Sequence, residues 1–227
     1  IRWIPITQFL AVSKRILKIG LPAAGANMLT PIAMAVLTAI IAVHGNAAVA
    51  GFGVGTRIES IASMVVLALS MTLPPFISQN FGAGQWDRVE QAYKSVIKFV
   101  LLWQLGVYLL LALAAGYIAM AFGKDDPVVM DVIKLFIWTL PLSYGFQGII
   151  ILSNSSLNAL HRPMSALVLS VIRLFVFYVP FAYLGSVYFG LVGLFVGALI
   201  GNVFTAIIAY KWFLKALPQA AVVKAEG

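Results

Sequence analysis

Hydrophobic residues run through the chain in six long stretches, separated by short polar or glycine-rich segments. The stretches cover residues 20–43, 49–78, 93–121, 129–157, 164–185 and 190–213. Each is about as long as the 20 or so apolar residues that a helix needs to cross a bilayer, or longer. Helices are the expected form because backbone in lipid must satisfy its own hydrogen bonds. The pattern therefore predicts an all-α membrane protein, a bundle of six transmembrane helices.

The intervening segments are short, so successive helices are expected to run antiparallel. They read HGNAA, QNFGAGQWDR, GKDDP, LHRP and GSVYFG, and glycine, proline and small polar residues are typical of turns. We predict a cytoplasmic amphipathic linker over residues 1–19, the six-helix unit over 20–214 and a cytoplasmic tail over 215–227. A helix on the inner leaflet suits the linker, and a plain solvated segment is the alternative. Because the chain begins with Ile1 and no signal peptide opens it, we expect a piece of a longer polypeptide.

Composition supports a lipid environment. Of the 227 residues, 62% are hydrophobic and only 10% are charged, whereas soluble domains are about 45–50% apolar and about 25% charged. A water-soluble protein of this size has too small a core to hide so much apolar surface. The absence of cysteine excludes disulfides and thiolate metal sites.

The net charge of +8 would suggest a nucleic-acid partner in a soluble domain. In a membrane protein, lysine and arginine instead collect in cytoplasmic loops. If the helices alternate in direction, one side carries Arg2, Lys14, Arg15, Lys18, Arg88, Lys94, Lys98, Arg162, Lys211, Lys215 and Lys224. The other side carries only Lys124 and Lys134, diluted by three aspartates. We therefore expect no nucleic acid, and a multi-pass membrane protein with both ends cytoplasmic.

Helix-breaking residues recur inside the spans: Pro22, Pro31, Pro74, Pro75, Pro141 and Pro180. Bends at such positions survive in a bilayer only where neighbouring helices or a wet cavity satisfy the freed carbonyls. They favour a transporter or channel over an inert anchor. The glycines at 193, 197 and 201 repeat every four residues and predict a smooth face for close helix packing.

Three charged residues, Arg57, Glu59 and Arg173, fall at membrane depth. A charge there costs several kcal/mol unless it faces protein or water. Arg57 and Glu59 are two apart and so point to different helix faces. We expect Glu59 to be buried with Arg57, Arg173 or backbone donors in reach. A structural lock between helices and a direct functional role both remain open for it.

Polar residues also form two stripes within the spans. One holds Asn27 and Thr30, and the other holds Gln147, Asn154 and Asn158, with spacings that place each set on one helix face. Interhelical hydrogen bonding explains any one of them, but two stripes together predict a wet cavity. The candidate cavity or coupling residues are Asn27, Thr30, Arg57, Glu59, Gln147, Asn154, Asn158 and Arg173.

Enzyme signatures are absent from the sequence. It contains no HExxH, GxSxG or P-loop, which excludes the chemistry that those motifs support. The run GFGVG at residues 51–55 lacks the third glycine of a dinucleotide fingerprint. No cluster of histidine and carboxylate marks a metal site, so we expect neither an enzyme nor a cofactor other than a coupling ion.

The motifs KIGLPAAGANMLTPI, AAVAGFGVGTRIESI, LPPFISQNFGAGQWDRVEQA and SSLNALHRP resemble the C-terminal half of a multidrug and toxic compound extrusion (MATE) transporter. The resemblance covers essentially the whole chain. It implies one six-helix lobe of a twelve-helix transporter of the bacterial inner membrane, with the N-terminal lobe of the same transporter as its partner. It further implies export of cationic lipophilic compounds, in exchange for protons or sodium ions, by rocking between inward-open and outward-open states.

One departure from the family pattern bears on the coupling ion. In the NorM-type branch, sodium is held in this lobe by a glutamate and an aspartate, and these align with the neutral Thr30 and Gln147. The resemblance therefore favours the DinF-like branch, whose proton-coupling aspartate lies in the other lobe. Two rival interpretations remain: a lipid-linked sugar flippase of the same superfamily, which calls for more cations in its cavity, and a non-transporting membrane scaffold.

Overall fold

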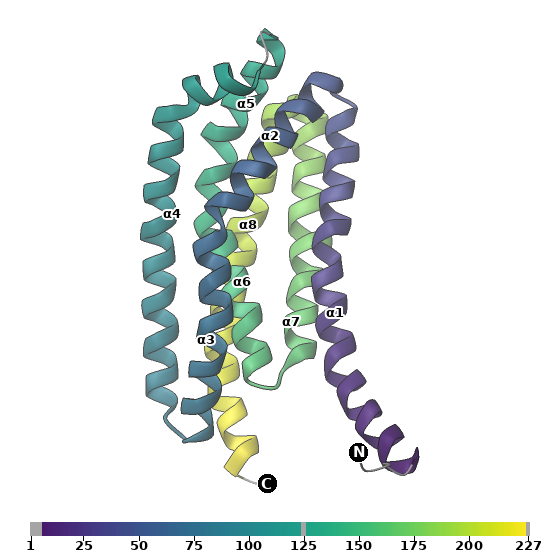
Figure 1. Cartoon of the computed structure of the whole chain (residues 1–227), viewed down its shortest axis with the longest axis vertical. Helices are drawn as coiled ribbons and strands as arrows, with labels where there is room; N and C mark the ends of the chain where they lie inside the picture. The colour runs from purple at the N-terminus through teal and green to yellow at the C-terminus, as the bar shows by residue number, and fades with distance from the viewer. Residues whose placement is uncertain (1–5, 124–125, 226–227) are drawn as a thin grey trace, which may run out of the picture.

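A computed structural model describes residues 6–123 and 126–225, and this part of the chain is all-helical. The side chains of several residues near the chain ends lie outside the description. The elements are α1 (Ile6–Ala42), α2 (Asn46–Ala62), α3 (Met64–Gly82), α4 (Trp86–Phe122), α5 (Pro127–Thr139), η1 (Leu140–Ser143), α6 (Tyr144–Ala159), α7 (Pro163–Val171), η2 (Ile172–Tyr178) and α8 (Val179–Ala225). Figure 1 shows long helices packed side by side, with both chain ends at the same end of the bundle.

The helices make the six passes that the hydrophobic pattern predicts. The second pass is α2 followed by α3, the fourth runs from α5 to α6, and the last two run from α7 to the end of α8. Continuous stretches that are long and apolar enough to cross a bilayer are Met64–Gly82, Trp86–Phe122, Pro127–Ala159 and Pro163–Leu217. The last stretch holds two passes because the chain reverses within α8. The predicted fold class is confirmed.

Two of the passes are broken near their middles. The second pass breaks at Ser63, between α2 and α3, and the fourth passes through the 3-10 turn η1, which contains Pro141. A proline cannot donate to the preceding turn, which accounts for the second break. Because α2 packs on α5 and α3 packs on α6, the two broken passes lie beside each other along their whole length.

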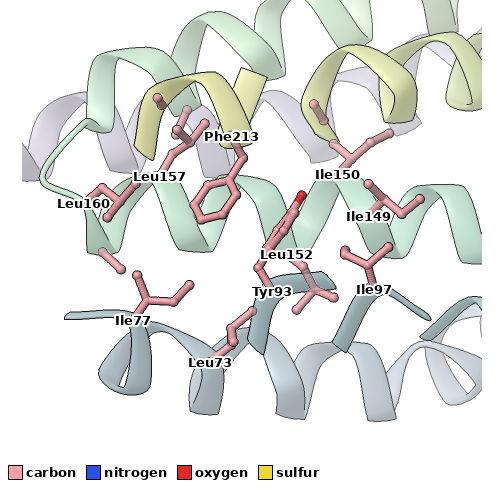
Figure 2. Packing of buried hydrophobic residues seen from close by; sticks show 14 of the residues in the cluster. Leu73, Ile77, Tyr93, Ile97, Ile149, Ile150, Leu152, Leu157, Leu160 and Phe213 are labelled. Atoms are coloured by element: carbon pink, nitrogen blue, oxygen red, sulfur yellow. The ribbon is translucent and has the colours of Figure 1, made fainter. Parts of the chain in front are cut away.

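The core consists of two hydrophobic clusters, one toward each end of the bundle. The cluster nearer the chain ends joins α3, α4, α6 and α8 (Figure 2), and the ring centroids of Tyr93 and Phe213 lie 4.1 Å apart in it. The Tyr93 hydroxyl also forms a 2.6 Å hydrogen bond with the Ser153 hydroxyl. The second cluster joins α1, α2, α5 and α8 around Phe52, Phe136 and Phe195. Each half of a broken pass is therefore packed into its own cluster.

The sequence pattern predicts a loop at GSVYFG, residues 185–190, and the structure differs there. Its residues are helical up to Phe189, and only Gly190, with φ of 62°, leaves helical geometry. A positive φ of this kind is accessible to glycine without strain, so one residue suffices for the reversal. The glycine stripe faces the fifth pass, which ends at the reversal within α8: a Cβ on Gly193, Gly197 or Gly201 would collide with the backbone of Gly185, Phe181 or residues 177–178. The packing role predicted for the stripe is confirmed.

The helices extend beyond the predicted six-helix unit at both ends of the bundle. The segment predicted as a linker is helical from Ile6 and continues without interruption into the first pass as α1. At the other end, α8 runs on through most of the predicted tail to Ala225. Pro74 and Pro75 lie inside α3 without ending it. Residues 1–5 and 226–227 of the predicted linker and tail lie outside the described residues.

The predicted orientation in the membrane can be checked with single cysteines, since the chain contains none of its own. Asn46 is the first residue of α2 and Ala83 lies in the turn after α3, and both are exposed, at opposite ends of the bundle. In intact cells, a thiol reagent that cannot cross the membrane is expected to label Asn46→Cys and to spare Ala83→Cys, because the lysine-rich end faces the cytoplasm. Labelling of both variants, or of Ala83→Cys alone, would refute this orientation.

Candidate functional site

Two adjoining cavities open between α1, α2, α3, α6 and the α7–η2 segment. Their volumes are about 420 Å³ and about 320 Å³. Both are lined by Thr30, Leu67, Gln147, Ile151, Arg173 and Leu174. We refer to the two together as the polar cavity. It brings together residues that are more than 140 positions apart in the sequence.

The α6 side of the cavity carries the predicted amide stripe. Gln147, Asn154 and Asn158 all line it, as their helical spacing requires. The side-chain amide of Asn154 donates to the Ser170 hydroxyl at 3.1 Å, and Ser170 in turn donates to the Ala166 carbonyl at 3.0 Å. The other polar atom of Asn154, Oδ1, is buried without a hydrogen-bond partner in the described structure. The stripe therefore joins α6 to α7 and still presents unused hydrogen-bonding capacity to the cavity.

Glu59 reaches the cavity from α2 and accepts a hydrogen bond from Gln147 Nε2 at 2.9 Å. Within residues 6–123 and 126–225, the ion pairs are Lys94 with Glu90 and Lys134 with Asp131. The expectation that an arginine or backbone donor would partner Glu59 was therefore wrong. The amide of Gln147 takes that place. Arg173 lines the same part of the cavity as Glu59, and its guanidinium lies against the Tyr178 ring.

Arg173 enters the cavity from η2, a seven-residue π-helical segment. The π-type hydrogen bond from the Val179 N–H to the Leu174 carbonyl comes one residue before Pro180, which cannot donate. Such segments often mark functional sites. The Arg173 guanidinium lies 5.8 Å from the ring centroid of Tyr178, within range of a cation–π interaction. Its Nε is buried and has no hydrogen-bond partner among the described residues.

The structure places six of the eight candidate residues around the cavity: Thr30, Glu59, Gln147, Asn154, Asn158 and Arg173. Arg57 is exposed and lines neither part of it, which agrees with the different helix faces expected for Arg57 and Glu59. Asn27 lies on α1, but its side chain is outside the described residues. The binding and coupling roles of these residues remain predictions.

The lining of the cavity combines polar groups with apolar side chains. Among the described residues, no three of the His, Cys, Asp and Glu side chains come together. Glu59 is the carboxylate that lines the cavity, beside the hydroxyl of Thr30 and the amide of Gln147. Amides, hydroxyls and one guanidinium can orient a polar group of an organic molecule while Ile151 and Leu174 contact its apolar part.

Sequence reasoning did not single out Gln104, which supports the break in the second pass. This α4 side chain is buried, and its Nε2 donates to the Ala62 carbonyl at 3.0 Å. Asn202 of α8 acts similarly at the other break, donating to the Ser143 hydroxyl at 3.3 Å. The role of Gln104 could have been found from the sequence, because it is a lone glutamine in the otherwise apolar run FVLLWQLGVY. An unpaired amide in lipid is costly, so this side chain needs a partner.

Replacing Gln104 by leucine is therefore expected to destabilise the protein by about 1–3 kcal/mol, because a buried carbonyl at the helix break loses its donor. Thermal unfolding in detergent measures this. Gln79→Leu is the matched control, since Gln79 is exposed at the end of α3, and it should leave the unfolding temperature nearly unchanged. Equal shifts in the two variants would contradict the role assigned to Gln104.

Comparison with known proteins shows the family. The model of the MatE family matches residues 22–184. The chain belongs to this family. It is 44% identical over 192 residues to the FAD transporter of Shewanella oneidensis, covering 85% of this chain and 42% of that protein. It is 25% identical over 210 residues to the probable multidrug resistance protein YpnP of Bacillus subtilis, covering 88% of this chain and 45% of that one.

Solved structures of MATE transporters support the same family assignment. The chain superposes on the Vibrio cholerae MATE transporter VcmN in its bent form with a TM-score of 0.89 and 34% identity, covering 96% of this chain and 49% of that one. The chain thus spans about half the length of the relatives and structures that it matches, which corresponds to one lobe. It is a multi-pass membrane protein of a transporter family and not an enzyme.

Proposed function

We propose that this chain is the C-terminal lobe of a MATE antiporter that exports organic compounds across the bacterial inner membrane. The observation that carries the proposal is the polar cavity, which is formed by side chains of α1, α2, α3, α6 and η2 at membrane depth. An N-terminal lobe of the same transporter faces this cavity across a central cleft. Rocking of the two lobes exposes the cleft to each side of the membrane in turn.

For the substrate we propose an amphiphilic organic acid, with FAD as the first compound to test. The only cavity carboxylate in the described structure, Glu59, is already hydrogen-bonded to Gln147, whereas the Nε of Arg173 is buried without a partner. Guanidinium groups are well suited to phosphate oxygens, and FAD contains a pyrophosphate. The relative named as an FAD transporter is 44% identical to this chain, which supports the same choice.

Cationic lipophilic drugs are the second candidate. Relatives at 23–25% identity are named as multidrug resistance or export proteins, and Glu59 supplies a negative charge in the cavity. Drug export was also the expectation from the sequence. The two substrate classes make opposite demands on Arg173, so one variant separates them.

The experiment expresses the complete transporter in cells and measures both FAD released into the medium and ethidium retained in the cells. Arg173→Met is expected to lower FAD export at least about tenfold, the effect of one charge-assisted hydrogen bond. Arg57→Met makes the same chemical change outside the cavity and should leave export intact. Wild-type ethidium efflux without FAD release would favour the second candidate, and export of neither compound would overturn the proposed function.

A further inference from the structure

A second hollow lies on the opposite side of α6 from the polar cavity. It has a volume of about 500 Å³ and is formed by α4, α6 and α8. Phe146 and Ile149 of α6 line it, whereas their neighbours Gln147 and Ile151 line the polar cavity. We call this hollow the lysine groove. A partner lobe seated on the polar cavity leaves the lysine groove on the outer surface of the transporter.

The groove is apolar along its length and basic at one end. Its walls are Ile97, Leu101 and Leu102 of α4, with Ala206 and Ile207 of α8. Lys94, Lys98 and Lys211 also line it, together with Tyr210. The outer face of α4 beyond the groove exposes further large apolar side chains, such as Leu109 and Leu113, as expected for a surface in contact with lipid tails.

The lysines lie at the level where the hydrocarbon layer ends. On α4, residues 99–122 contain no Lys, Arg, Asp or Glu, which as a helix is a length of about 36 Å. On α8, residues 190–210 are equally free of charge, over about 30 Å. Both lengths match a bilayer core of about 30 Å. Lys98 and Lys211 are the first charged residues beyond these runs, so they meet the lipid headgroups.

The positive charge at the basic end of the lysine groove is only partly compensated by carboxylates. Lys94 forms an ion pair with Glu90 at 2.5 Å. Within the described part of the chain, Lys98 and Lys211 have no ion-pair partner, and both are exposed. A neighbouring hollow shares Lys211 and adds Lys215 and Trp212, an aromatic residue of the type that anchors helices at the interface.

We propose that the lysine groove is a binding site for an anionic phospholipid. The phosphate and acidic headgroup are held by Lys98 and Lys211, and one acyl chain follows the apolar walls past Leu101 and Ile207. Basic pockets between transmembrane helices are suited to such headgroups. The positive charge of the groove repels a cationic drug. A second copy of this chain would bring its own lysines close to Lys98 and Lys211, and like charges repel.

The test is native mass spectrometry of the complete transporter, titrated with phosphatidylglycerol or with phosphatidylcholine of the same acyl chains. We expect phosphatidylglycerol to bind at least fivefold more tightly. The triple variant Lys94→Gln, Lys98→Gln, Lys211→Gln is expected to weaken phosphatidylglycerol about tenfold or more, since each unpaired lysine near the headgroup contributes roughly fivefold. The control variant Lys14→Gln, Arg88→Gln, Lys134→Gln removes the same charge outside the groove and should bind as the wild type does.

A second variant keeps the proposal testable without any change of charge. Ile207 is 47% exposed, so Ile207→Trp narrows the groove without disturbing buried packing, and it should also weaken phosphatidylglycerol binding. Millimolar inorganic phosphate should fail to displace the lipid, because the acyl chain contributes to binding. Equal affinity for the two lipids, equal losses in the two triple variants, or full displacement by phosphate would each overturn the assignment.

Discussion

Replacement of Gly197 by leucine is expected to prevent correct folding of the last helical hairpin. A Cβ at this position would collide with the backbone carbonyl group of Phe181 in the fifth pass, before the reversal within α8. Backbone cannot turn aside as a side chain can, so the two helices would have to separate. We expect a loss of several kcal/mol, at or above the roughly 4 kcal/mol that marks exceptional destabilisation, seen as aggregation in size-exclusion chromatography.

The matched control for this variant is Gly106→Leu. Gly106 also lies in a helix, but a Cβ there meets no atom within 4 Å, so leucine would extend into lipid. This variant should express and elute as the wild type does. Similar behaviour of the two variants would mean that the loss of glycine itself, rather than close helix packing, determines the outcome.

The second large effect concerns Glu59. Replacing it by leucine removes the acceptor for Gln147 Nε2 and is expected to lower the free energy of unfolding by about 1–3 kcal/mol. Glu59→Gln keeps an oxygen acceptor at the same place and should lose less. If Glu59 locks α2 to α6 rather than carrying the coupling proton, Glu59→Gln in the complete transporter leaves the pH dependence of transport unchanged.

Asp131→Leu serves as the control for Glu59→Leu, because Asp131 is 77% exposed and pairs with Lys134 at the bundle end. Exposed pairs of this kind contribute at most about 1 kcal/mol. Thermal unfolding and the pH profile of transport are measured on the same preparations. A shifted pH profile in Glu59→Gln with unchanged stability would reassign Glu59 to ion coupling.

The number and order of the passes could be predicted from the sequence because lipid imposes a simple rule: about 20 apolar residues for each helix. The break at Ser63 could not, since IASM at residues 61–64 contains no proline or glycine. Its cause is tertiary: Gln104 of α4 satisfies the Ala62 carbonyl that the break leaves free. The reversal at Gly190 was placed in a longer loop for a related reason, because helix packing rather than local composition keeps GSVYFG helical.

The sequence predicted most of the residues that line the candidate site but not which of them form hydrogen bonds with one another. Helical spacing placed Gln147, Asn154 and Asn158 on one face, and they line one cavity in the structure. The partner of Glu59 was missed because the sequence argument matched charge with charge, whereas a hydrogen-bonded amide also compensates a buried carboxylate. Arg57 was included on the same argument, although its position on α2 directs it away from the cavity.

The most direct test of the proposed transport cycle uses proteoliposomes that contain the complete transporter and either FAD or ethidium. We propose proton coupling because a sodium charge at membrane depth calls for a compensating carboxylate, and Glu59, the single carboxylate among the described lining residues of the polar cavity, already accepts a hydrogen bond from Gln147. A pH gradient alone is therefore expected to drive export of the substrate, with choline in place of sodium, while liposomes containing this chain alone transport nothing. Export that persists with a sodium gradient at equal pH, and stops when choline replaces sodium, would contradict the account.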